Sequence, residues 1–227
     1  MYNNFDTITN PYKQESRPKR IIKTTLFLLL IAIIVVCFVY LATHYAKPVH
    51  GASMQPTLNN ASADDRDIVI VNKYTQPNYG DIVIIDVSGI DSRYTGIVDK
   101  DASLLIKRLI AMPGDRIRME YDNATQKTTV FLNGTELVED YIADSKSYTY
   151  YNNFVQQTHW EHKITPVNGE IIIPDDMVFC MGDNRDNSKD CRYFGPVKLS
   201  TIKGVVENIL PEGSVINNIL SWIFKFE

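Results

Sequence analysis

The sequence is poor in cysteine, and this limits how its fold can be held together. Only three of its 227 residues are cysteines. So few cysteines cannot form the disulfide framework of a small secreted domain, so a hydrophobic core must stabilise the fold. Positive charge is not in excess either, because the net charge is -4. A nucleic-acid-binding surface usually needs a basic patch, so we expect no nucleic-acid partner.

Histidine is also scarce. The four histidines are His44, His50, His159 and His162. None lies in a catalytic pattern and the sequence has no G-x-S-x-G elbow, so the common serine–histidine hydrolases are not indicated. His159 and His162 have only Glu161 nearby as a further ligand, and the acidic run that begins at Asp183 lacks the Gly and Glu of a calcium loop. We therefore expect no metal and no cofactor.

A long uncharged segment covers residues 24–43. Twenty residues of helix span about 30 Å, the thickness of the hydrocarbon core of a bilayer. This exceeds the apolar core of a cleavable signal peptide, and no small-x-small cleavage site follows it. Basic residues crowd the preceding flank, which favours a cytoplasmic N-terminus. We expect a cytoplasmic basic tail at 1–23, a transmembrane anchor at 24–43 and an extracytoplasmic domain at 44–227.

Residues beyond the anchor are typical of a mostly β protein. Short β-branched runs bounded by turn residues are typical of strands. Such runs occupy 67–72, 81–87, 104–112, 128–132, 135–138, 170–173, 177–181 and 204–210. Asn133-Gly134 is a strong hairpin signal. The pattern predicts an antiparallel sheet or barrel, with an insertion around 116–175 in which residues 141–162 have weak structure.

The C-terminal residues 215–226 place apolar side chains at helical spacing. Two interpretations are open. The helix could dock on the sheet, or it could lie on the surface of a bilayer, since twelve residues are too few to span one.

Ser53 and Lys107 are the candidate reactive side chains. Ser53 lies in a small turn at 51–58, and Lys107 ends an apolar run at 104–107. A serine hydroxyl needs a base, and a lysine can act as one only when it is neutral. Lowering a lysine pKa from about 10.4 to about 7–8 requires roughly 4 kcal/mol, which burial can supply. Taken alone, however, a lysine in a strand is usually an exposed charge.

Four sequence boxes behind the anchor change this assessment. They read G-x-S-M-x-P-T-L at 51–58, G-D-I-V at 80–83, K-R-x-x-x-x-P-G-D at 107–115 and G-D-N-R-D-N-S-x-D at 182–190. In this order they resemble type I signal peptidases, membrane-anchored Ser–Lys proteases that remove secretory signal peptides.

The resemblance implies a role for each matching residue. Ser53 would be the nucleophile and Lys107 the general base, which makes 44–227 the catalytic domain. Ser188 would hydrogen-bond and orient the lysine, and Asp190 and Arg192 would form a supporting ion pair. Gly51 stands where some bacterial members carry an oxyanion-stabilising serine, which leaves the oxyanion to the Ser53 backbone N–H and to Gly51.

The resemblance also implies the substrates and the location. The partners would be secretory preproteins with small residues at the first and third positions before the cut, together with membrane lipid. The location would be the cell membrane, with a single pass. An extended substrate bound as a β-strand would place alternate side chains in shallow pockets. The candidate pocket residues are Met54, Leu58, Leu105 and Ile106.

Two other functions compete with this one. A catalytically idle relative could act as a membrane-anchored pilus assembly factor, but such proteins lack the dyad. A self-cleaving repressor shares the dyad chemistry, but it would be cytosolic and carry a DNA-binding domain, and the anchor and the acidic balance argue against it.

Cys180 and Cys191 leave two possibilities open. Ten residues separate them. A disulfide would close a loop of that size and stabilise it by roughly 2–3 kcal/mol. Alternatively, both are buried thiols that pack as small hydrophobic side chains.

Overall fold

A computed structural model describes residues 17–60, 66–90, 103–142, 148–157, 160 and 163–224. The chain divides into two compact units, Met1–Ala42 and Thr43–Glu227. His159 and His162, considered above as metal ligands, lie outside the described residues.

The first unit is dominated by a single helix, α1 (Arg17–Thr43), in which no side chain is buried. Its 27 residues make it about 40 Å long. The helix is long and apolar enough to cross a membrane. It includes the predicted segment 24–43 and extends it by about two turns at the basic end.

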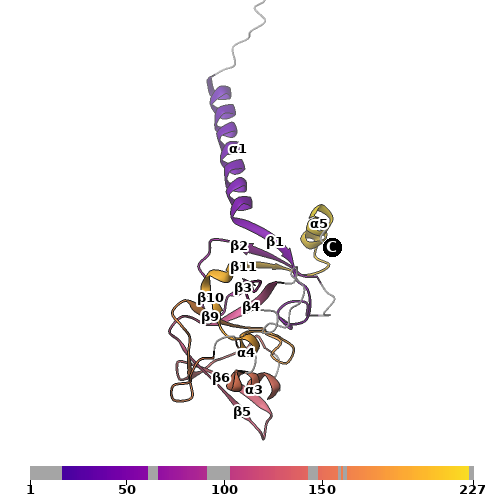
Figure 1. The fold of residues 1–227 in the computed structure, drawn as a ribbon. Coiled ribbons are helices and arrows are strands. Elements are labelled where there is room, and N and C mark those ends of the chain that lie inside the picture. Colours follow the sequence, from indigo (N-terminus) through magenta and orange to yellow (C-terminus); the bar gives the residue numbers. More distant parts are fainter. Residues whose placement is uncertain are drawn as a thin grey trace, which may run out of the picture. The chain divides into compact units, whose positions relative to one another are not determined.

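A seven-stranded sheet forms the larger part of the second unit (Figure 1). Its neighbours pair antiparallel throughout. In spatial order the strands are β1 (His44–Pro48), β2 (Ile68–Asn72), β11 (Ile202–Leu210), β3 (Ile82–Asp86), β4 (Leu104–Ala111), β9 (Met177–Met181) and β10 (Val197–Lys198). β1 was not predicted, because its polar sequence lacks alternation, and it forms by pairing with β2.

A four-stranded sheet completes the β structure. Its strands are, in order, β7 (Thr135–Glu136), β6 (Lys127–Leu132), β5 (Arg116–Asp122) and β8 (Ile171–Ile172). Asn133 and Gly134 connect β6 to β7 with φ values of 51° and 81°, as expected of a hairpin turn that needs positive φ at both positions. The predicted fold class, mostly β and antiparallel behind one N-terminal apolar helix, is confirmed.

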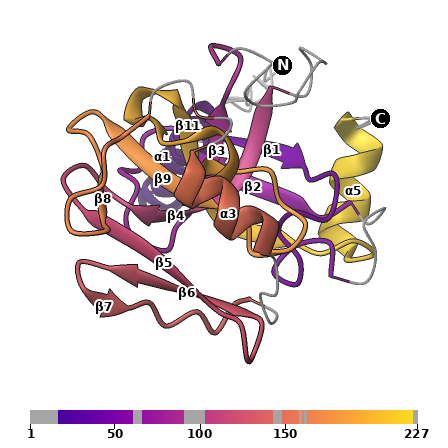
Figure 2. The same ribbon diagram turned by 60° about the horizontal axis from the view of Figure 1, so that its bottom comes forward.

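The described part of the second unit also contains short helices. They are α3 (Tyr148–Gln156), α4 (Cys191–Phe194), the 3-10 turn Leu199–Thr201 and α5 (Val215–Phe224). α3 packs against β5 and α4 (Figure 2). The prediction of weak structure at 141–162 is wrong for α3. Phe154 of this helix is buried, with its ring centroid 5.9 Å from that of Trp160 and 5.8 Å from that of Phe179, so tertiary burial stabilises the helix.

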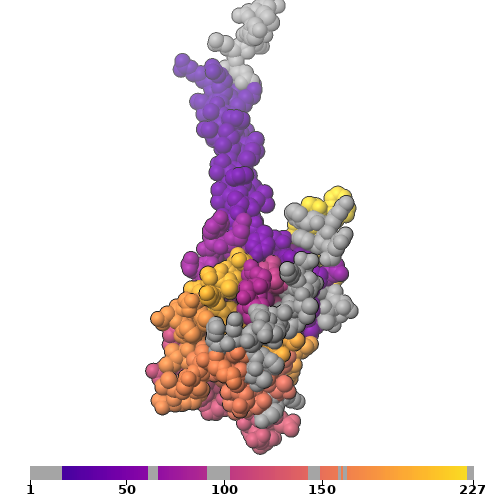
Figure 3. All heavy atoms as spheres, in the orientation of Figure 1, coloured from indigo at the N-terminus to yellow at the C-terminus, as the bar shows by residue number. Residues whose placement is uncertain are grey.

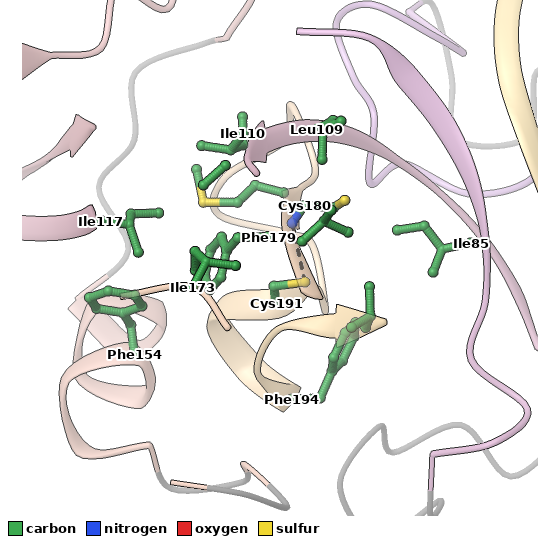
Figure 4. Close-up of a cluster of buried hydrophobic side chains, with 14 of the residues drawn as sticks. Ile85, Leu109, Ile110, Ile117, Phe154, Ile173, Phe179, Cys180, Cys191 and Phe194 are labelled. Carbon is green, nitrogen blue, oxygen red and sulfur yellow. Dashed lines mark hydrogen bonds between the residues drawn. The ribbon is translucent and has the colours of Figure 1, made fainter. Parts of the chain in front are cut away.

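The core consists of two hydrophobic clusters, and β3 contributes to both. Val83 and Ile85 belong to the larger cluster, whereas Ile82 and Ile84 belong to the smaller one. Successive side chains of a strand point to opposite faces, so β3 is covered on both sides. Figure 4 shows part of the larger cluster, which includes Phe179.

Cys180 and Cys191 lie in the larger cluster as free, fully buried thiols. The Cys180 backbone N–H donates to Cys191 Sγ at 3.2 Å (Figure 4). The disulfide considered from the sequence is therefore not formed. Burial raises the pKa of the Cys180 thiol, and this disfavours the thiolate that disulfide chemistry requires.

Candidate active site

Ser53 and Lys107 meet although they lie 54 positions apart in the chain. Lys107 Nζ lies 2.8 Å from Ser53 Oγ and donates a second hydrogen bond to Ile106 O at 2.8 Å. Lys107 is part of β4, whereas Ser53 lies in the turn between β1 and β2. The contact therefore joins a residue of a strand to a residue of a turn.

Lys107 is buried, with 3% of its surface exposed. It lies opposite Val83 of the neighbouring strand. Burial lowers the pKa of Lys107 to about 8, and the negative charge of Asp190 opposes that shift only in part. Slightly above neutral pH, Lys107 is therefore neutral in a large fraction of the molecules. A neutral amine can take the proton of a hydroxyl.

Two apolar side chains anchor the turn that carries Ser53 in the core. Met54 and Leu58 are 1% and 0% exposed and pack in the smaller cluster. Asn59 closes the turn, because its Nδ2 donates to Val49 O at 3.2 Å and to Gly51 O at 3.1 Å. Gly51 has φ +82°, a conformation that favours glycine.

Residues 182–190 hold the same turn from the other side. The Asn184 backbone N–H donates to Ser53 O at 3.1 Å, and Asn184 Nδ2 donates to Ala52 O at 3.0 Å. Gly182 lies so close that an added Cβ would be 2.4 Å from Ser53 O. The backbone around the hydroxyl is therefore positioned by a segment about 130 residues away.

A buried ion pair links β4, which carries Lys107, to residues 182–190. It was not predicted from the sequence. Asp183 is fully buried and accepts hydrogen bonds from Arg108 Nε at 2.8 Å and Arg108 Nη2 at 2.6 Å. It also accepts one from the hydroxyl of Thr57. All three residues lie inside the sequence boxes. Their presence there was the available signal, but only the fold reveals which of them pair.

The pair predicted between Asp190 and Arg192 is present and buried. Arg192 Nε and Nη2 donate to the Asp190 carboxylate at 2.9 and 2.8 Å, and the Gly182 N–H donates to it at 2.9 Å. Although burial would raise it, the pKa of Asp190 is lowered by Arg192. This carboxylate therefore stays charged and fixes the start of α4.

Ser188 is also buried, but its predicted hydrogen bond to Lys107 is not formed. Lys107 Nζ donates to Ser53 Oγ and Ile106 O instead, and the Ser188 hydroxyl lies beside the Asp190 carboxylate, whose pKa it helps to lower. Ser188 remains beside the turn, since a Cβ added to Gly182 would be 2.2 Å from its Oγ.

A cavity of about 430 Å³ opens beside the two reactive side chains. Of the four candidate pocket residues, Leu105 and Ile106 line this cavity, whereas Met54 and Leu58 do not. The latter two point into the smaller cluster, where they support the turn instead. Lining residues that were not anticipated are Lys47, Pro48, Val49, His50, Val69, Ile84 and Leu104. Among the residues that the structure describes, no group of three or more metal-binding side chains is found.

Known proteins have sequences similar to this one. A family model described as signal peptidase, peptidase S26, matches residues 19–210. The chain is 31% identical to signal peptidase I P of Bacillus subtilis subsp. natto over 201 residues, which cover 86% of this chain and 92% of the relative. It is 34% identical to signal peptidase I S of Bacillus subtilis (strain 168) over 148 residues, 63% of this chain and 64% of the relative.

A solved structure of a signal peptidase I from Enterococcus faecalis V583 is 26% identical. The match covers 58% of this chain and 97% of that one, with a TM-score of 0.37.

Proposed function

The chain belongs to the signal peptidase family, peptidase S26, and we propose that it cleaves signal peptides with Ser53 as nucleophile and Lys107 as general base. Its relatives are signal peptidases I, and the chain is a serine peptidase of that kind. The observation that carries the residue assignment is the 2.8 Å contact between Lys107 Nζ and Ser53 Oγ.

The first chemical step forms an acyl-enzyme. Neutral Lys107 takes the proton of Ser53 as Oγ attacks the carbonyl carbon of the scissile peptide bond. The resulting tetrahedral intermediate collapses, the C–N bond breaks, and the ammonium of Lys107 returns the proton to the leaving amine. The exported protein departs with a new N-terminus.

The second step releases the signal peptide. Lys107, neutral again, takes a proton from a water that attacks the ester carbonyl, and then returns it to Ser53 Oγ. Stabilisation of the oxyanion in both steps is assigned to the Ser53 backbone N–H and to Gly51. Gly51 has nothing within 4 Å of an added Cβ, which supports an open approach for the substrate carbonyl.

The preferred substrates are preproteins with small side chains at the first and third positions before the cut. An extended peptide has alternate side chains on the same side, and the cavity beside Ser53 would receive them. Leu105 and Ile106 form part of its wall. A wall made of strand backbone and branched side chains excludes large residues by overlap.

The protein is membrane-anchored, and we assign α1 as the single span. The N-terminus would be cytoplasmic, because positive charges flank the helix there. The second unit would then lie outside the cytoplasm, where exported preproteins emerge. Protease added to intact spheroplasts would degrade that unit in this orientation and would leave it intact in the opposite one.

Cleavage of a preprotein by the purified full chain tests the assignment. Ser53→Ala and Lys107→Ala should each abolish processing, and the double variant should be no worse than either, because the two residues act as a unit. Ser200→Ala and Lys198→Ala are matched controls at exposed positions and should cleave normally. The same assay with Phe in place of Ala before the cut should show little product.

Processing by either dyad variant would refute the Ser–Lys assignment, and equal processing of the Phe substrate would refute the proposed specificity. The alternative of a catalytically dispensable pilus assembly factor is not favoured, since the relatives reported above are signal peptidases.

A further inference from the structure

The C-terminal helix α5 exposes its apolar side to the surroundings. Trp222 is 81% exposed, which is extreme for a tryptophan in a folded domain. The exposed apolar residues of the helix are Val215, Ile216, Ile219, Trp222 and Ile223. At 3.6 residues per turn these positions fall on one side of the helix. Figure 3 shows α5, in yellow, protruding from the surface of the second unit.

The opposite side of α5 is attached to the domain by polar groups. Asn217 is 3% exposed, and its Nδ2 donates to Arg66 O at 3.1 Å and to Leu210 O at 2.9 Å. Ser221 Oγ donates to Asn217 Oδ1 at 3.2 Å. A helix on the surface of a soluble domain normally buries its apolar side. α5 does the reverse, which requires an apolar environment outside the domain.

We propose that α5 lies in the interfacial layer of the membrane that α1 crosses, with these five apolar side chains in contact with lipid. Ten residues make a helix of about 15 Å, which is too short to span a bilayer but suited to lie along its surface. Tryptophan is also the side chain that prefers the interface between acyl chains and headgroups. α5 follows the residues matched by the family model, which end at 210.

The connectivity favours a bilayer over a second protein. β1 begins at His44, directly after α1, and it neighbours β2, which neighbours β11, which leads into α5. The covalent link to the anchor thus keeps the domain near a bilayer at high effective concentration. A stable protein interface needs roughly 1,200 Å² or more of buried surface, which one face of a short helix does not supply. A bilayer requires no complementary shape.

Contact between α5 and lipid would also affect the turn that carries Ser53. Asp67 accepts a hydrogen bond from the Glu212 N–H at 2.9 Å, just before α5, and another from the Asn59 N–H at 2.8 Å. Asn59 in turn donates to Gly51 O. If α5 is held in the interface, this chain of contacts sets the height of the Ser53 turn above the membrane, a consequence that rests on the proposed function.

Tryptophan quenching in lipid vesicles tests the proposal without relying on peptidase activity. The full chain is reconstituted into phosphatidylcholine–phosphatidylglycerol vesicles with brominated or unmodified acyl chains. The sequence has two tryptophans. Trp160 is 3% exposed and its indole N–H donates to Arg192 O, so it serves as an internal reference. Bromine should remove most of the Trp222 emission, and Trp222→Phe should abolish this lipid-dependent quenching.

Two further variants provide a matched comparison. Ile219→Glu places a charge in the apolar face and should reduce the quenching of Trp222 several-fold. Asn218→Glu places the same charge on the neighbouring exposed residue, beside that face, and should leave the quenching nearly unchanged.

Three results would overturn the proposal. The first is equal bromine quenching of the wild type and Trp222→Phe. The second is full access of aqueous iodide to Trp222 in vesicles. The third is protection from iodide without bromine quenching, which would identify a protein partner in place of lipid.

Discussion

The two halves of the reactive pair are held in different ways. Lys107 lies in β4, between two strands, and its backbone position is fixed by the sheet. Ser53 lies in a turn whose position depends on hydrogen bonds from Asn59 and Asn184. The proposed base, Lys107, therefore depends mainly on its environment, which sets its pKa, whereas the proposed nucleophile, Ser53, depends mainly on its position. Perturbing each side separately tests this distinction.

The largest effect is expected from crowding the serine side. Gly182→Ala would place a Cβ 2.2 Å from Ser188 Oγ and 2.4 Å from Ser53 O, so the backbone of the turn must shift. A displacement of about 1 Å near a reacting group can reduce the rate about 100-fold. We expect a loss of that order in kcat, measured as preprotein cleavage.

Gly89→Ala is the matched control for this substitution. Gly89 has nothing within 4 Å of an added Cβ and no positive φ, so cleavage should be unchanged. Wild-type kcat in Gly182→Ala would mean that the turn tolerates displacement and that the proposed dependence on position is wrong.

The same distinction explains which parts of the site were predictable from the sequence. The apolar run before Lys107 was compatible with a buried lysine, but a strand lysine alone favours an exposed charge, and the resemblance of the sequence boxes was needed to assign it. The contacts of Asp183 with Arg108 and of Asn184 with the serine turn could not be read, because they join segments distant in the chain. The role of Met54 as a supporting core residue was missed for the same reason.

The fold shows a similar limit. The short β-branched strands were predicted from composition, but β5 was missed although Ile117 and Met119 alternate with polar residues and are buried. α3 gave no clear period and forms because Phe154 is buried against other aromatic rings. Whether Cys180 and Cys191 form a disulfide depends on their tertiary environment. Their closeness in the sequence does not decide it.

The next effect is expected on the lysine side, in stability. The pKa of Lys107 is lowered from 10.5 to about 8, so below pH 8 the native state carries a buried ammonium that the unfolded state exposes to water. Lys107→Met removes this cost and should raise the free energy of unfolding by about 3 kcal/mol at pH 7, while abolishing cleavage.

The sign of the pH dependence checks this prediction. Between pH 8 and 10.5 the unfolded state holds the proton and the native state does not, so the stability of the wild type rises with pH. The gain from Lys107→Met should therefore fall to less than half by pH 9.5. Thermal unfolding in detergent would measure it, with the exposed Lys198→Met as control. No gain at pH 7 would contradict the assigned cost of burial.

The smallest effect is expected in the pH dependence of cleavage. Because Lys107 must be neutral to accept the proton of Ser53, kcat/KM should rise about tenfold per pH unit below its pKa and level off above it. With a pKa of about 8, the midpoint of the ascending limb should lie near pH 8 for two unrelated substrates, since this limb reports the free enzyme. Gly182→Ala should lower the plateau, because it displaces the serine turn, and should move the limb little, because burial of Lys107, the main cause of its low pKa, is retained. A limb near pH 10.5 would show that Lys107 is solvated. A limb that moves with Gly182→Ala would show that position and environment are not separate properties of the two halves.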